Sequence, residues 1–159
     1  MPPLPKHLRP RWRYLAVHVE SWPDAELRRR SFQGQVWQAA RSLFGDAGAA
    51  RLDLTVIRFA FDDGTGHAIV RTRRGETDDA RAAIATVAAI DEQPIGLRVA
   101  GISGTVRACE EKYLGRRTEA TEQRTVAFDD AERRAAVRDE RVDVGEDGAY
   151  AGATTLDLQ

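Results

Sequence analysis

The stretch WRYLAVHVE, residues 12–20, decides the fold, because its side chains alternate with the period of two that a half-buried strand requires. Arg13 stands at the entry of this strand, and Leu15, Val17 and Val19 follow on the same face. The other face carries Trp12, Tyr14, Ala16 and His18. The sequence therefore predicts a first strand that buries one apolar face against elements further along the chain.

A long amphipathic helix is predicted next. In SWPDAE, residues 21–26, Ser21 stands three residues before Asp24 and Pro23 falls in the first turn, which is the spacing of a helix N-terminus. Apolar residues then recur at helical intervals, namely Phe32, Val36, Ala40, Leu43 and Phe44. We expect this helix to end at Gly45 and a loop to occupy residues 46–51.

Two strands joined by a turn follow, then a second helix and a fourth strand. LDLTVIRFAF (52–61) is rich in β-branched and aromatic residues, DDGTG forms the turn, and GHAIVRTRR (66–74) returns. A helical pattern from Glu76 stops at Pro94, and IGLRVAGI (95–102) follows. This order predicts an α+β, ferredoxin-like βαββαβ sandwich, in which two helices back a four-stranded antiparallel sheet.

An added helix is expected after the fourth strand, capped by Ser103, ended by Gly115 and apolar on the side of Val106, Cys109 and Tyr113. Beyond it, FDDAERRAAVRDER (128–141) has the pattern of a marginal charged helix, and the final residues lack core-forming periodicity. We therefore predict a domain over residues 1–117 and an acidic tail over residues 118–159 that is partly helical or disordered.

Charge divides the chain in the same way. Residues 1–117 hold 19 Lys and Arg against 14 Asp and Glu, whereas residues 118–159 hold 5 against 11. A basic body with an acidic tail suggests that the body meets a polyanion, and removal of the tail is expected to leave folding intact. Of the basic residues, 22 are arginine and 2 are lysine, a bias that fits a halophilic source or a GC-rich genome.

Several classes of function are excluded by the sequence. No apolar run approaches the roughly 20 residues that span a bilayer and the N-terminus lacks a secretory signal, so a cytoplasmic protein is expected. Cys109 and three histidines offer no metal-ligand spacing. Asp62 and Asp63 fit a turn better than a catalytic pair, and Glu110 and Glu111 are adjacent on a helix, so their side chains diverge. We predict no catalytic residues and no metal site.

Three basic clusters are the candidate RNA contacts. They are Lys6, Arg9, Arg11 and Arg13 around His7, Trp12 and Tyr14; Arg71 and Arg73, followed by Arg74, on the third strand; and Arg107, Lys112, Arg116 and Arg117 around the added helix. A solvated surface would carry the same charges, so composition leaves both interpretations open. An RRM is excluded because GHAIVRTR lacks its aromatic signature, which leaves recognition of RNA shape and backbone.

Two stretches resemble a known family. LPKHLRPRWRYLAV (4–17) and VAGISGTVRACEEKYLG (99–115) are similar to the most characteristic segments of archaeal ribonuclease P protein component 2, a family with a eukaryotic member in the ribonuclease P and MRP particles. The run from Ser103 to Ala108, followed by Lys112 and Tyr113, is the most specific part. The resemblance covers about residues 4–117 and nothing beyond them.

This resemblance implies a ferredoxin-like subunit of a particle whose RNA removes the 5′ leader of precursor tRNA. The protein would bind no cofactor, because Mg²⁺ is expected on the RNA. The implied partners are ribonuclease P RNA, precursor tRNA, the TIM-barrel protein component 3 in a two-plus-two assembly, and other ribonuclease P proteins. A haloarchaeal source would agree with the arginine bias.

Two alternatives from other classes share the predicted fold. A small-molecule-sensing regulatory domain would need a Gly-rich loop after the first strand, where this chain has Ser21, Trp22 and Pro23. An acyl phosphatase would need a phosphate-cradling loop with an arginine at the same place, and none is present. Both alternatives therefore rank below the RNA-binding subunit.

Overall fold

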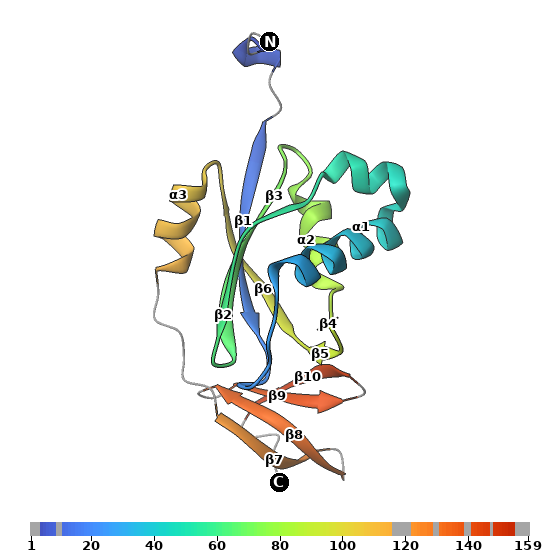
Figure 1. The fold of residues 1–159 in the computed structure, drawn as a ribbon, viewed down its shortest axis with the longest axis vertical. Coiled ribbons are helices and arrows are strands. Elements are labelled where there is room, and N and C mark those ends of the chain that lie inside the picture. Colours follow the sequence, from blue (N-terminus) through green and yellow to red (C-terminus); the bar gives the residue numbers. More distant parts are fainter. Residues whose placement is uncertain are drawn as a thin grey trace.

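The described part of the chain contains two four-stranded antiparallel sheets, a two-stranded ribbon, three α-helices and two short helical turns. The computed structural model describes residues 4–8, 11–115, 122–128, 131–138, 141–146 and 148–154 (Figure 1). The predicted α+β class and the four-stranded antiparallel sheet are confirmed for the first of the two sheets.

The first sheet contains β1 (Trp12–Glu20), β2 (Thr55–Asp62), β3 (Thr65–Arg73) and β6 (Gly96–Ser103). Its strand order is β2-β3-β1-β6, and every neighbouring pair is antiparallel. The register shifts once between Ala16 and Val17 of β1 and once between Val56 and Arg58 of β2. A two-stranded ribbon of β4 (Ala89–Ile90) and β5 (Gln93–Pro94) precedes β6, and a 3-10 turn, η1 (Lys6–Leu8), precedes β1.

Helices α1 (Arg29–Leu52) and α2 (Thr77–Ala85) cover one face of this sheet, which we call the helical face (Figure 1). The main core lies between these two helices and the sheet. It contains the predicted inward positions Leu15, Val17 and Val19 of β1. All three side chains are at most 1% exposed, and Phe32 and Val36 of α1 pack into the same cluster. The period-two pattern of residues 12–20 therefore identified the buried face correctly.

The predicted start of the first helix was wrong, whereas its predicted interruption at Gly45 is confirmed and only the loop expected over residues 46–51 is wrong. Ser21 does not cap it, because its hydroxyl is buried and donates to the carbonyl oxygen of Pro94 at 2.8 Å. The helix begins only at Arg29. At the other end Gly45 leaves helical geometry with φ 72°, yet helical residues resume and continue to Leu52. Leu52 is fully buried, so its burial favours one more helical segment where we had predicted a loop.

The opposite face of the sheet, which we call the α3 face, carries the added helix. This helix consists of α3 (Val106–Cys109), continued by a π-helical turn, η2 (Glu110–Leu114). Thr105 caps it, since its hydroxyl accepts a hydrogen bond from the backbone N–H of Ala108. Val106, Cys109 and Tyr113 face the sheet and pack with Ala16 and Ile69. The predicted helix and its apolar side are confirmed, although Thr105 caps it and Ser103 does not.

The ring of Tyr113 requires a glycine beneath it. A Cβ atom at residue 101 would lie 2.1 Å from a ring carbon of Tyr113, which is far inside van der Waals contact. Gly101 therefore allows η2 to approach β6 closely. This contact fixes the added helix against the sheet at the level of Ala16.

Replacement of Tyr113 by Asp should lower the free energy of unfolding by about 2–3 kcal/mol, because it places a carboxylate against an apolar cluster and removes ring contacts. Lys112→Gln is the matched control: it also changes the charge by −1, and Lys112 is exposed. Chemical denaturation of both variants measures the difference. Equal midpoints for the Tyr113 variant and the wild type would mean that the helix does not pack on the sheet.

The C-terminal part of the chain corrects the sequence prediction. Where we expected a tail that is partly helical or disordered, the described residues form β7 (Glu122–Phe128), β8 (Ala131–Arg138), β9 (Arg141–Glu146) and β10 (Ala149–Thr154). Their order is β10-β9-β8-β7, antiparallel throughout. The physical reason is a period of two: Ala135 and Val137 pack with Val142 and Val144 on one face.

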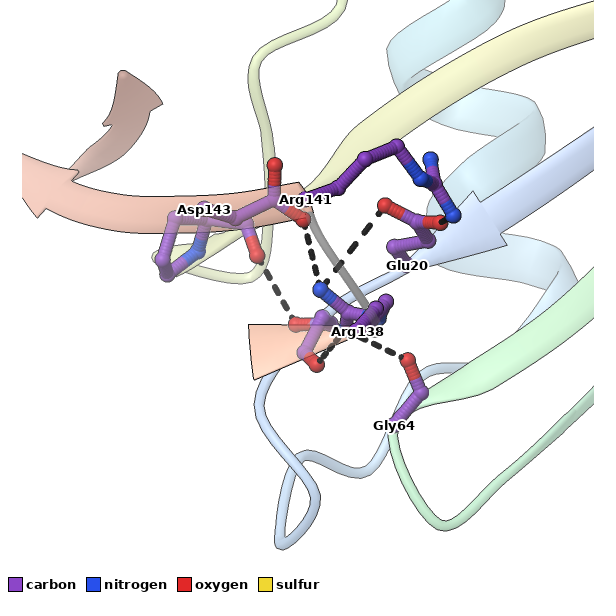
Figure 2. A network of polar contacts seen from close by, with 7 residues as sticks. Glu20, Gly64, Arg138, Arg141 and Asp143 are labelled. Atoms are coloured by element: carbon purple, nitrogen blue, oxygen red, sulfur yellow. Dashed lines mark hydrogen bonds and ion pairs between the residues drawn. The ribbon is translucent and has the colours of Figure 1, made fainter. Parts of the chain in front are cut away.

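The second sheet docks on the end of the first through a buried arginine. Arg138 of β8 is 1% exposed, and its Nη2 donates to the carbonyl oxygens of Ser21 at 2.6 Å and Gly64 at 2.9 Å (Figure 2). Its Nη1 donates to Oδ2 of Asp143 at 2.5 Å and lies 3.7 Å from Oε2 of Glu20. Both acceptor carbonyls belong to the first domain, so Arg138 joins the two sheets.

Aromatic contacts complete this junction. Trp22, which follows β1, is 5% exposed and meets the ring of Tyr150 edge to face, with 5.0 Å between ring centres. The guanidinium carbon of Arg134 lies 4.1 Å from the centre of the Trp22 ring, and Gly145 lets β9 approach the same ring closely. Because these contacts join the two sheets, we no longer expect that removal of residues 118–159 leaves folding intact.

Two carboxyl groups share the buried junction with Arg138. Burial and the neighbouring Glu20 raise the pKa of Asp143 to about 7, in spite of the attraction of Arg138 and Arg141. Burial alone would raise the pKa of Glu20, but its hydrogen bond with Asp143 and the charges of Arg138 and Arg141 outweigh that effect and lower this pKa. The pair therefore holds a proton near neutral pH, with Glu20 as the ionised partner of the arginines.

Candidate functional site

The first two predicted basic clusters meet around Trp12. In the register of β1 and β3, Trp12 lies opposite Arg73 and Tyr14 lies opposite Arg71. The guanidinium carbon of Arg71 is 4.0 Å from the centre of the Trp12 ring, and that of Arg73 is 5.8 Å away. We call Trp12, Arg71 and Arg73 the tryptophan cluster.

Stacking on Trp12 holds Arg71 without using its hydrogen-bonding groups. No described residue makes a hydrogen bond or ion pair with Arg71, and its Nε is buried without a partner. A stacked guanidinium keeps its planar N–H fork available for a phosphate. Arg73 is more committed, because its Nη2 lies 3.5 Å from Oδ2 of Asp53. Both side chains are exposed enough for this weak pair to exchange with an incoming anion.

The N-terminal cluster is divided by the strand. Arg11 is exposed and its backbone carbonyl accepts a hydrogen bond from the N–H of Arg74, which fixes it next to the tryptophan cluster. Arg13 alternates with Trp12, so its side chain leaves β1 on the helical face. Its guanidinium then approaches Gly104, the residue after β6. Lys6 is exposed in η1, ahead of β1. Arg9 lies outside the described residues.

The third cluster lies on the outer side of the added helix. Arg107 is 87% exposed and pairs with Glu111 one turn later, at 2.9 Å. Lys112 is exposed and has no ion pair with any described residue. Arg58 of β2 pairs with Glu110 and ties the helix to the sheet. Arg116 and Arg117 lie outside the described part of the chain.

Because the added helix packs on Tyr14, Ile57 and Ile69, it is the immediate neighbour of the tryptophan cluster. Arg107 and Lys112 therefore share the α3 face with Arg71 and Arg73. The structure thus brings Arg71 and Arg73 together with Arg107 and Lys112 on one side of the sheet, joins Arg11 to them, and places Arg13 at the rim.

One group of side chains escaped the sequence analysis. Strand register places His67, His18 and Arg98 opposite one another on β3, β1 and β6. The sequence contains these residues far apart, and only the pairing of three strands unites them. The signal that could have found them is the strand order itself, combined with the alternation of each strand.

The described residues contain no cluster of metal ligands, and burial affects the chemistry of the one cysteine. No group of three His, Cys, Asp or Glu side chains among them could hold a metal ion. Burial and the nearby Glu110 raise the pKa of Cys109 to about 11, so its thiol stays protonated and unreactive at neutral pH. Within the same residues, no helix is both long enough and apolar enough to cross a membrane.

The loop after β1 also speaks against the ligand-binding alternatives. Ser21 and Trp22 are buried under the C-terminal sheet, where Arg138 and Tyr150 cover them. A small-molecule sensor or an acyl phosphatase would need this loop to be open to its ligand. The described geometry leaves the α3 face as the candidate site.

The chain is similar in sequence to proteins of one known family. The Rpp14/Pop5 family profile matches residues 13–114. "Ribonuclease P protein component 2" of Halorubrum lacusprofundi is 58% identical over 156 residues, which cover 98% of each chain. The protein of the same name from Thermococcus kodakarensis is 31% identical over 111 residues, covering 70% of this chain and 89% of the relative.

A chain in the cryo-EM structure of yeast ribonuclease MRP aligns over 63% of this chain and 79% of its own length, with 17% identity and a TM-score of 0.46, a likeness too low to add to the argument. The sequence matches stand without it, since the profile spans more than half of the chain and the haloarchaeal relative spans nearly all of it. The chain belongs to the Rpp14/Pop5 family.

Proposed function

We propose that this protein is a subunit of ribonuclease P that binds the catalytic RNA and supports removal of the 5′ leader from precursor tRNA. The observation that carries the proposal is the 58% identity, over 98% of both chains, to a protein named ribonuclease P protein component 2. The gathering of arginines on the α3 face supports it, because such a surface can neutralise RNA phosphates that must pack closely together.

In this proposal the protein supplies charge and shape, and the RNA supplies the reaction. Mg²⁺ held by the RNA activates water and stabilises the leaving oxygen. In this proposal the protein contributes no acid, base or metal ligand to the reaction. Arg71, preoriented by Trp12, would hold a phosphate in a bidentate manner, a short-range contact that persists at high salt better than long-range attraction does.

We also infer that residues 12–103 form a ferredoxin-like sandwich, for which the strand order β2-β3-β1-β6 and the two helices on one face are the support. The remaining partners follow from the proposed function: precursor tRNA, the TIM-barrel protein component 3 in a two-plus-two assembly, and the other ribonuclease P proteins. Such a particle would act in the cytoplasm.

Salt titration of binding to ribonuclease P RNA tests this function and its site together. We expect the wild type to bind this RNA more tightly than an unrelated structured RNA of equal length. Replacement of Arg11, Arg71 and Arg73 by Gln should weaken binding and reduce the log–log dependence on salt by about 0.7–0.9 for each lost phosphate contact. Lys6, Arg9, Arg107, Lys112, Arg116 and Arg117 would then be tested in the same way.

The matched control changes the same number of charges on the other side of the molecule. Arg30 and Arg41 lie on α1 and Arg81 lies on α2, and all three are exposed. Their replacement by Gln should leave affinity and salt dependence close to those of the wild type. If both triple variants behaved alike, the α3 face would have no special role in RNA binding.

A further inference from the structure

A second group of nitrogen-bearing side chains lies on the α3 face, some distance from the tryptophan cluster. His18 of β1 is directly opposite His67 of β3 on one side and Arg98 of β6 on the other. Their neighbours in sequence, among them Val17, Ala68 and Val99, pack into the core on the helical face. The three side chains therefore project from the α3 face in one row, which we call the histidine row.

The histidine row lies between two covered parts of the sheet. In the row nearer the N-terminus of β1, Ala16 and Ile69 are buried under the added helix, and Gly101 meets the ring of Tyr113. In the row on the other side, Glu20 is held by Arg138 and Arg141 of the C-terminal sheet. Figure 1 shows the added helix beside the N-terminal half of β1 and the C-terminal sheet beyond the other end of the strand.

Charge around the histidine row favours an anion. Arg98 is exposed and makes no ion pair or hydrogen bond with any described residue. The nearest carboxylate along β1, Glu20, already has two arginine partners, with Nη2 of Arg141 at 2.8 Å from its Oε1. Asp62 of the outer strand β2 is exposed. It pairs with Thr65 of β3, so it belongs to the same neighbouring row as Glu20 and is separated from Glu20 by Thr65. Arg98 and His67 thus have hydrogen-bond donors to offer to an anion, whereas His18 already has a hydrogen bond with the backbone of Tyr113.

The surroundings also raise the cost of a positive charge on His18 when no anion is bound. Burial, Arg98 and His67 together lower the pKa of His18, against the opposing effect of Glu20 and a hydrogen bond with the backbone of Tyr113. A phosphate placed over the row would offset this mutual repulsion. The same repulsion disfavours a metal cation, which would need the two imidazoles as ligands beside a guanidinium.

We propose that the histidine row of His18, His67 and Arg98 is a second contact for the phosphate backbone of the RNA that this protein binds; the proposal rests on the proposed function. Neighbouring strands are about 4.8 Å apart, so the row spans roughly 10 Å, enough for one or two phosphate groups. His18 follows Trp12 by six positions along β1, a distance of roughly 20 Å. A structured RNA can reach both contacts if it passes over the added helix.

The test is a salt titration of ribonuclease P RNA binding with the full-length protein. Replacement of His18, His67 and Arg98 by Gln should weaken binding roughly tenfold and reduce the salt dependence by about 1 in log–log slope, as expected for lost phosphate contacts. Arg98→Gln alone should give part of this loss. Arg41→Gln is its matched control, because Arg41 is also exposed but belongs to α1 on the helical face.

A second measurement locates the contact. The ring signals of His18 and His67 in the NMR spectrum of the wild type should shift on addition of the RNA, and they should shift less with inorganic phosphate at equal phosphate concentration. Melting temperatures of the variants should equal that of the wild type, so that loss of binding is not loss of fold.

Three outcomes distinguish the proposed RNA contact at the histidine row from the proposed function of the protein. If the wild type binds ribonuclease P RNA and the row variant loses affinity while Arg41→Gln does not, the inference is supported. If the wild type binds this RNA but the row variant keeps its affinity and slope and the ring signals stay fixed, the inference is overturned and the proposed function stands. If the wild type shows no preference for ribonuclease P RNA, both are overturned.

Discussion

Replacement of Arg138 by Ala is expected to lower the free energy of unfolding by about 3–5 kcal/mol, the range found when one partner of a buried charged network is removed. Arg138 is 1% exposed, and its removal would leave the carbonyl oxygens of Ser21 and Gly64 without their donor. It would also leave Asp143 and Glu20 facing each other with less compensating positive charge. Each of these changes penalises the folded state.

The matched control is Arg134→Ala on the same strand. Arg134 also reaches the first domain, with its Nη2 2.8 Å from Oδ1 of Asp24, but its side chain is 41% exposed. Its ion pair and its stacking on Trp22 together should contribute about 1–2 kcal/mol. Equal denaturation midpoints for the Arg138 and Arg134 variants would contradict the view that Arg138 anchors the C-terminal sheet.

The relatives differ in whether their alignment with this chain extends over the C-terminal sheet. The relative from Halorubrum lacusprofundi aligns over 98% of this chain and therefore includes most of β7 to β10, whereas the family profile ends at residue 114. The relative from Thermococcus kodakarensis aligns over 111 residues that make up 89% of its length.

Most of the first domain could be predicted because its strands are local patterns. Alternation over residues 12–20 selected Leu15, Val17 and Val19 as core residues, and all three are buried. The helix ends were harder to predict, because tertiary contacts decide them. Ser21 prefers the carbonyl of Pro94, 73 residues away, and burial of Leu52 draws α1 past Gly45.

The C-terminal sheet shows a different limit of sequence reasoning. AERRAAVR, residues 131–138, fits a charged helix by composition, yet alternation puts Ala135 and Val137 on one face and Arg134 and Arg138 on the other. The choice between these structures depends on what each face meets. Here Arg138 finds buried acceptors on a distant turn, a contact that no local pattern could reveal.

The sequence predicted which charged residues are candidate RNA contacts, but it did not predict how their side chains are arranged in space. The sequence identified Arg71 and Arg73, but the ring that orients them became visible only through the pairing of β1 with β3. It treated Arg13 as part of one strip with Arg11, whereas strand alternation separates the two. His18 and Arg98 were not selected at all, since a cross-strand row has no signature along the chain.

The measurement that tests the central claim most directly is cleavage of precursor tRNA by reconstituted components. We expect the purified, nuclease-treated protein to leave precursor tRNA intact at any concentration, because in the proposed function the RNA, with its bound Mg²⁺, performs the hydrolysis. Added to ribonuclease P RNA with Mg²⁺ and its protein partner, it should raise the cleavage rate more than about tenfold, equivalent to about 1.4 kcal/mol of transition-state stabilisation. Removal of the RNA should abolish that activity completely. Release of the 5′ leader by the RNA-free protein, or an equal rate with and without the protein in the complete mixture, would contradict the account.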